Sequence, residues 1–230
     1  MKTKNTYTKV LLIITIVLFS FSSKLFSQEK DFSLWSEIQF EVELIEDFKF
    51  CISEEFRFDE NISRIDKYYT NLGFKYRIIK QIRVAVYYRF LQKQELNSSY
   101  SSRNKFFSDI KLEKDINRFE ISFRSRYQTK YTDYFSSENG NIPANKWRNK
   151  LNIDYDIKNS PIKPFLSSEI FYQTNNNEGN RIDELRFKAG MDIGINEHQE
   201  IEFSYILSKE INVKNPLTNN IFSVEYSFAF

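Results

Sequence analysis

The sequence predicts an all-β protein, a transmembrane antiparallel up-and-down β-barrel of about 10–12 strands. Three observations lead to this fold class. Apolar and polar residues alternate with a period of two along most of the chain after residue 28, as on a two-faced strand. The connections between the alternating stretches are short and long in turn. The chain also has 23 Phe and 14 Tyr although its mean hydropathy is −0.53, which suits interleaved apolar and charged faces.

The composition excludes several classes of protein. One Cys excludes a disulfide framework, a Cys-rich zinc site and a CxxC redox pair, and one His excludes a multi-His metal centre. The 33 basic and 31 acidic residues nearly balance, which argues against a nucleic-acid partner. We therefore expect no metal, no cofactor and no bound nucleic acid.

Residues 1–27 have the pattern of a secretory signal peptide, so residues 28–230 form the predicted barrel. Three lysines precede an apolar run over 10–21, and serines follow it near the expected cleavage site at Ser27. A retained membrane anchor is the alternative, but the apolar run is short for a membrane span. Removal of this segment takes away four lysines and no acid, which leaves a mature chain with a net charge of −2.

The first predicted strand, 32–44, shows the sorting clearly. Phe40, Val42 and Leu44 share one face, and Glu41 and Glu43 share the other. A helix would place Glu41 and Leu44 on the same side, so the helical period fails where the period of two succeeds.

The next strands follow in order, each with an apolar and a polar parity. Phenylalanines alternate with charged residues in 48–59. Aromatic and aliphatic residues alternate with lysines and arginines in 66–78 and 82–93. The alternation is weaker in 104–114, and aromatic residues alternate with arginines in 117–131. We count five more strands in the second half by the same rule: 146–157, 164–174, 184–195, 201–209 and 222–230. All four prolines fall in connections or at a strand start, where no ladder hydrogen bond is lost.

The predicted strand number is eleven, whereas bacterial single-chain barrels have an even number. We prefer twelve if the weak 95–114 region contains an additional short strand. Short turns at one end and longer polar loops at the other indicate periplasmic turns and extracellular loops. The long loops at 132–145 and 210–219 would be presented on the outside of the cell.

Two further features favour a membrane barrel over a soluble one. Strands of about 11–13 residues rise roughly 35–40 Å, enough to cross a bilayer when tilted, and soluble strands are usually shorter. Tyr226, Phe228 and Phe230, at the end of the sequence, share the apolar face of the last predicted strand. This arrangement resembles the signal read by the barrel-assembly machinery. We expect location in the outer membrane of a Gram-negative bacterium, with outer-membrane lipid and that machinery as partners.

The polar parity predicts a charge network in the lumen. Its arginines and lysines gather on the third, fourth and sixth strands and its acids on the first, eighth, tenth and eleventh, so one wall would be basic and the opposite wall acidic. The network either closes as a salt-bridged plug, which we prefer from the barrel size, or surrounds a narrow pore. The residues expected in it are Glu41, Glu43, Glu55, Arg57, Lys75, Arg77, Arg89, Arg118, Glu120, Arg124, Arg126, Arg148, Asp154, Glu169, Arg186, Asp192, Glu202 and Glu225.

An enzymatic function has little support in the sequence, and we predict no catalytic residue. His198 falls in a short turn, far from an outer-leaflet substrate, and Cys51 has no partner for a catalytic thiol. Gly190 and Gly194 lie on a strand without a phosphate loop, where they relieve crowding in the lumen or permit a bend.

Several short segments resemble the domain of unknown function 2490 family. They are Trp35, EEFRF at 54–58, YYRF at 87–90, FRSRYQ at 123–128, WRNKL at 147–151, the Pro164, Glu169 and Phe171 spacing, and the strand with Gly190 and Gly194. The resemblance covers nearly the whole mature chain. It implies an outer-membrane β-barrel and adds no catalytic residue.

The expected function is therefore that of an outer-membrane barrel, closed or narrow, with a charged lumen and extracellular loops. A porin-like channel for small solutes is the alternative, and a soluble lipid-carrier barrel is the second alternative.

Overall fold

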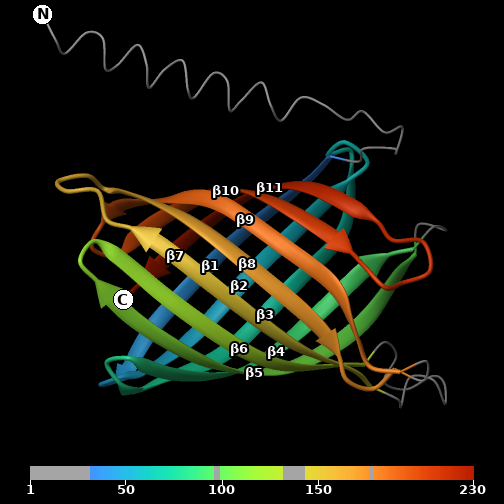
Figure 1. Ribbon diagram of the computed structural model, residues 1–230, viewed down its shortest axis with the longest axis horizontal. Helices are drawn as coiled ribbons and strands as arrows, with labels where there is room; N and C mark the ends of the chain where they lie inside the picture. Colours follow the sequence, from blue (N-terminus) through green and yellow to red (C-terminus); the bar gives the residue numbers. More distant parts are fainter. Residues whose placement is uncertain (1–31, 96–98, 132–142, 177–178) are drawn as a thin grey trace, which may run out of the picture. The chain divides into compact units, whose positions relative to one another are not determined.

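The computed structural model describes residues 32–95, 99–131, 143–176 and 179–230. The predicted signal peptide and most of the 132–145 loop lie outside these residues. The described chain folds into one closed barrel of strands (Figure 1). Its strands are β1 (Phe32–Ile45), β2 (Phe48–Asp59), β3 (Arg64–Ile79), β4 (Ile82–Gln94), β5 (Tyr100–Ile116), β6 (Phe119–Tyr131), β7 (Ala144–Tyr155), β8 (Ile162–Gln173), β9 (Arg181–Asn196), β10 (Gln199–Glu210) and β11 (Thr218–Ala229).

Each strand pairs antiparallel with its sequence neighbours, and the barrel closes where β1 pairs parallel with β11. The closing pair is parallel because the strand number is odd. The all-β barrel of about 10–12 strands is thus confirmed, whereas the preference for twelve is wrong for the described residues. The weak region forms one long strand, β5, which begins at Tyr100 instead of residue 104.

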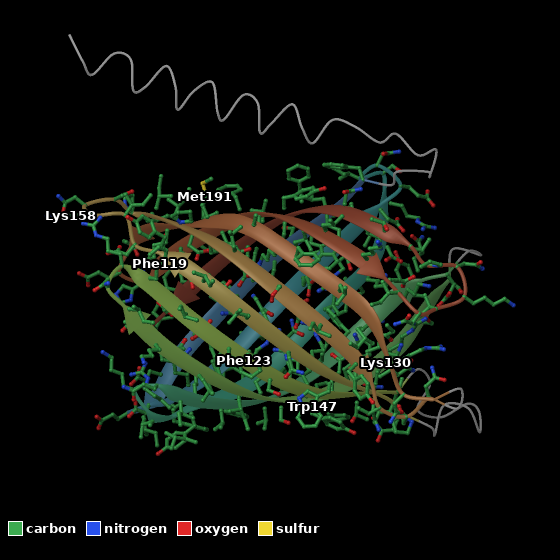
Figure 2. All side chains as sticks on the ribbon, viewed as in Figure 1. Phe119, Phe123, Lys130, Trp147, Lys158 and Met191 are labelled. Carbon is green, nitrogen blue, oxygen red and sulfur yellow. The ribbon has the colours of Figure 1, made fainter. Side chains whose placement is uncertain are left out.

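The alternation in the sequence separates the outer from the inner surface. The even-numbered residues of β1 from Ile38 to Leu44 are exposed, and on β2 the odd-numbered residues from Cys51 to Glu55 are buried inside the barrel. Large apolar side chains of other strands also cover the outside, among them Phe123, Trp147 and Met191 (Figure 2). Most large apolar side chains thus point outward, and the inside holds charged and small side chains together with a few buried rings such as Phe107 and Phe171.

The connections alternate in length as the sequence predicts. Four of the turns at one end have two residues between strands, and the fifth, between β7 and β8, spans 156–161. Asp47 and Asn117 adopt positive φ in two of these turns, a backbone region that Asp and Asn tolerate. We call this the short-turn end and the opposite end the long-loop end.

Two glycines admit aromatic rings into the barrel. Gly73 pairs with Tyr87 and Gly190 pairs with Phe165, and each ring lies where a Cβ on its glycine would stand. Large rings can face the crowded lumen at these positions because the cross-strand partner has no side chain.

The last residue continues the closing pair. The backbone N–H of Phe230 donates to the Glu41 carbonyl at 2.9 Å, and the N–H of Glu43 donates to the Phe230 carbonyl at 3.1 Å. The terminal residue is therefore held in the barrel wall by its backbone. As for helices, the described part of the chain contains none with the length and apolarity to cross a membrane.

Candidate functional site

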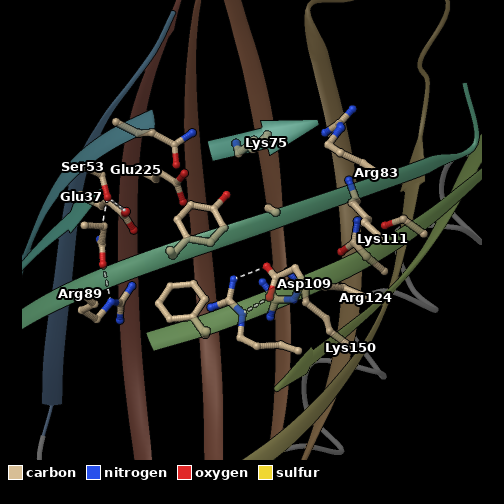
Figure 3. A pocket seen from close by; sticks show the side chains of 18 of the residues that line it. Glu37, Ser53, Lys75, Arg83, Arg89, Asp109, Lys111, Arg124, Lys150 and Glu225 are labelled. Carbon is tan, nitrogen blue, oxygen red and sulfur yellow. Dashed lines mark hydrogen bonds and ion pairs between the residues drawn. The ribbon is translucent and has the colours of Figure 1, made fainter. Parts of the chain in front are cut away.

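Two cavities that share lining residues lie inside the barrel, one in each half. A cavity of about 420 Å³ lies toward the short-turn end, where Arg83 and Lys111 line it (Figure 3). A second cavity of about 540 Å³ lies toward the long-loop end, where Lys67 and Lys130 line it. We call them the turn-side and loop-side cavities. Seven residues line both and form what we call the belt: Glu37, Arg89, Arg124, Arg126, Lys150, Lys188 and Glu225.

Ion pairs inside the barrel hold most of the arginines in and next to the belt. Glu169 on β8 accepts hydrogen bonds from Arg124 at 2.7 Å and from Arg148 at 2.9 Å. Asp109 accepts two hydrogen bonds from Arg126, both at 2.6 Å, in the bidentate geometry that favours Arg over Lys. These carboxylates are almost fully buried, so the positive charge of each guanidinium offsets the free-energy cost of burying a carboxylate.

Aromatic rings of the interior support the guanidinium groups from the other side. Arg57 lies 3.5 Å from the centre of the Trp35 ring, Arg126 lies 4.1 Å from that of Phe107, and Arg148 lies 4.4 Å from that of Phe171. Each of these arginines therefore combines a carboxylate partner with a cation–π contact. The alternation of apolar and polar residues does not predict the inward rings of Phe107 and Phe171, because both occupy positions on the charged face of their strands.

A continuous row of carboxylates crosses the closing pair of strands. Successive register partners on β2, β1, β11, β10 and β9 are Glu55, Glu37, Glu225, Glu202 and Asp192. Ser53 donates to Glu37 at 2.6 Å and Lys188 pairs with Glu202 at 2.6 Å. Glu225 has no hydrogen bond or ion pair from its side chain to any residue that the structure describes. None of the acidic, His or Cys groupings in the described ranges has the geometry to hold a metal ion.

The comparisons with known proteins agree with this architecture. A family model described as a protein of unknown function, DUF2490, matches residues 32–216. The chain belongs to this family. The resemblance stated from the short segments is therefore confirmed.

Among solved structures, this DUF2490 protein is similar to the β domain of the Bordetella autotransporter BrkA. The match has a TM-score of 0.51 at 10% sequence identity and covers 81% of this chain and 85% of that one. At this identity the likeness concerns the fold alone. The comparison with curated proteins gives no match.

Most predicted network residues of this DUF2490 protein lie inside the barrel with a partner of opposite charge. Glu41 pairs with Lys75, and Glu43 lies 3.9 Å from Lys49. The remaining paired members are Glu55 with Arg57 and Arg89, Arg124 and Arg148 with Glu169, Arg126 with Asp109, Arg186 with Glu184, and Glu202 with Lys188.

Some predicted members lie elsewhere or lack an ion pair. Arg118 is wrong as a lumen residue because β6 begins at Phe119, which leaves Arg118 exposed in the preceding turn. Arg77 pairs with Asp47 at 3.3 Å at the mouth of the short-turn end, where Arg77 is exposed and Asp47 is half-buried. Glu120, Asp154, Asp192 and Glu225 point inward without an ion pair to the described part of the chain.

The predicted division into a basic and an acidic wall holds for part of the barrel only. The acids of β1, β10 and β11 are neighbours because these strands adjoin at the closing pair. Glu169 does not belong to that acidic side, since β8 lies between β7 and β9 and its carboxylate serves two arginines.

The structure also shows the surroundings of His198, Cys51 and the two glycines of β9. His198 lies in the turn between β9 and β10, and its Nδ1 is 2.8 Å from the Ala229 carbonyl oxygen. Cys51 is a free, buried thiol on the inner face of β2. Gly190 relieves crowding beside Phe165, and a Cβ on Gly194 would meet only the Pro161 carbonyl oxygen at 3.9 Å.

Proposed function

We propose that this DUF2490 protein is a non-enzymatic β-barrel of the Gram-negative outer membrane, with a narrow lumen closed to large solutes by the belt. The observation that carries the proposal is the separation of its two surfaces. Apolar side chains cover the outside of every strand, while paired charges fill the inside. A soluble barrel has the opposite distribution, because water surrounds it and its core is dry.

Three further features support the membrane location. A closed sheet satisfies every backbone hydrogen bond inside lipid, which an open sheet cannot do. The likeness to an autotransporter β domain supports an outer membrane as the location. The exposed terminal aromatic of Phe230 supports insertion by the barrel-assembly machinery. In this orientation the short turns face the periplasm and the long loops face outward.

The two tryptophans provide a direct test of the membrane location. Trp147 is exposed on the outer surface, whereas Trp35 lines the loop-side cavity beneath Arg57. We would place Trp35→Phe and Trp147→Phe, each with one remaining Trp, in vesicles that contain brominated phosphatidylcholine. The fluorescence of Trp147 should be quenched by the lipid bromine, and that of Trp35 should not.

Two results would contradict this proposal. Equal quenching of both tryptophans would mean that the two faces are not separated by lipid. Recovery of the protein in the periplasmic fraction without detergent would instead support the soluble lipid-carrier barrel.

A small-solute pore is the second candidate function. It is favoured by the fact that both cavities reach the belt, so the interior is hollow on either side of one charged layer. Single-channel recording in planar bilayers separates the two candidates. The closed barrel predicts no discrete conductance from protein whose heat-modifiable gel migration shows that it is folded, and discrete steps would establish the pore.

A further inference from the structure

The loop-side cavity is strongly basic. Thirteen of its lining residues are Lys or Arg, and six are Glu. The turn-side cavity has a smaller excess, with eight basic and four acidic residues. The cavity that faces the long loops therefore attracts anions more strongly than the cavity at the other end.

Most of these cations are neutralised by a carboxylate of the barrel, but three lysines of the loop-side cavity are not. Lys105, Lys130 and Lys150 line it, and no carboxylate of the described chain lies within 4 Å of any of them. By contrast, Lys146 pairs with Asp183 at 2.6 Å and Lys188 pairs with Glu202 at 2.6 Å.

Lys105 and Lys130 stand opposite other cations in the sheet. Lys105 on β5 is the direct register partner of Arg89 on β4 and of Lys130 on β6. Like charges directly opposite each other destabilise a strand pair. The nearest compensating group to Lys105 is the Tyr69 ring, whose centre is 5.9 Å from the ammonium nitrogen. That distance gives little stabilisation beside the positive charges of Arg89 and Lys130.

An anion bound between Lys105 and Lys130 would relieve this repulsion and accept hydrogen bonds from both ammonium groups. We propose that the loop-side cavity is a binding site for a low-mass solute with several negative charges, on phosphate or carboxylate groups. Lys105 and Lys130 hold one anionic group, and Lys150, a member of the belt, adds electrostatic attraction. The cavity volume of about 540 Å³ restricts the ligand to a small solute. This binding goes beyond the proposed function and does not depend on whether the belt conducts.

Isothermal titration calorimetry on the folded protein in detergent tests the site, with inorganic pyrophosphate as the phosphate probe and citrate as the carboxylate probe. Low-salt buffer limits screening. We expect saturable binding of at least one probe. The double variant Lys105→Gln, Lys130→Gln should bind that probe about tenfold more weakly or worse, since two charged hydrogen bonds are lost.

Matched variants make the result specific. Lys111→Gln removes a lysine from the same face of β5, but in the turn-side cavity and beside Glu113, so affinity should stay within about twofold of the wild type. The double variant Lys105→Arg, Lys130→Arg keeps both charges and should retain binding. Heat-modifiable migration checks that each variant is folded.

The site is absent if the folded wild type binds neither probe saturably, or if the double Gln variant binds as tightly as the wild type. Because the titration is made in detergent, either result leaves the membrane location untouched. Conversely, a failed lipid-quenching experiment leaves the anion site untouched.

Discussion

Glu37 and Glu225 are direct partners across the parallel β1–β11 pair, and both side chains point into the belt (Figure 3). Glu225 is also the register partner of Glu202 on β10. The strands that close the barrel are thus joined through a row of like charges, although a hydrophobic or oppositely charged pair would stabilise the junction more.

The replacement Glu225→Gln should therefore stabilise the barrel. The change removes like-charge repulsion from two neighbours and breaks no ion pair among the described residues. At an alkaline pH, where the carboxylates of Glu37, Glu202 and Glu225 are all ionised, we expect the free energy of unfolding to rise by about 0.2–1 kcal/mol. Urea titration of the protein folded in vesicles measures it.

The control Glu169→Gln removes one lumen carboxylate as well, but it leaves Arg124 and Arg148 without their partner. It should lower the free energy of unfolding by about 3–5 kcal/mol. If both variants change stability in the same direction, the distinction between the acidic row and the paired network is wrong.

Gly190→Ala should destabilise the barrel by about 1–3 kcal/mol, because the added methyl group meets the Phe165 ring and the β10 backbone. The same substitution at Gly194, on the same strand, meets only a carbonyl oxygen at 3.9 Å and should be nearly neutral. The same urea titration compares the two. Equal losses would show that backbone freedom, and not the approach of the ring, requires glycine at position 190.

The contacts of Glu95, just beyond β4, with Ser99 and Ser101 should be sensitive to acid. The Ser101 hydroxyl donates to its carboxylate at 2.6 Å, and this hydrogen bond, with Lys93 and Arg103 nearby, holds the pKa of Glu95 below its ordinary value. A lowered pKa stabilises the fold above the ordinary pKa of a glutamate, and this stabilisation is lost as the pH falls through the lowered value.

Hydrogen exchange at the Glu95 amide, which donates to the Ser99 carbonyl at 2.8 Å, reports on this contact. Its protection, corrected for the intrinsic rate, should fall on acidification through that range. In Glu95→Gln the protection should not change with pH over the same range. An identical pH profile in the two proteins would assign the effect to another group.

Phe230→Ser should reduce assembly in cells without weakening the finished barrel. The Phe230 side chain is 64% exposed, and its backbone, which the substitution retains, makes the hydrogen bonds to β1. We expect less protein in the outer-membrane fraction and unchanged refolding in detergent.

Leu217→Ser is the matched control, because it also removes an exposed apolar side chain, just before β11 begins. It should leave assembly unchanged. A refolding defect in Phe230→Ser would mean that the terminal ring stabilises the barrel itself.

The strand pattern was readable from the sequence because a closed sheet with one apolar face imposes the period of two on every strand. β5 has the weakest alternation of apolar and polar residues. Its outward positions include Ser102 and Ser108, and its inward positions include Phe107, so local hydrophobicity reverses where the ring supports Arg126. The contrast between the two faces disappears at such positions, so the sequence pattern predicts a loop over residues 100–103 where the structure has a strand.

Most of the site could be predicted as a set but not as pairs. Parity correctly placed Arg124, Arg148 and Glu169 inside, yet only the register between β6, β7 and β8 shows that one carboxylate serves two arginines. The error at Arg118 came from the strand boundary, since a two-residue turn continues the alternation for one position beyond the strand.

The parallel closing pair has a practical consequence for where the first and last residues of the barrel lie. β1 begins at the long-loop end and β11 finishes at the short-turn end, so Phe32 and Phe230 lie at opposite mouths. A peptide label fused directly ahead of Phe32 and one fused after Phe230 would emerge on different sides of any membrane that the barrel crosses. Protease shaving of intact cells could then read the orientation from a single polypeptide.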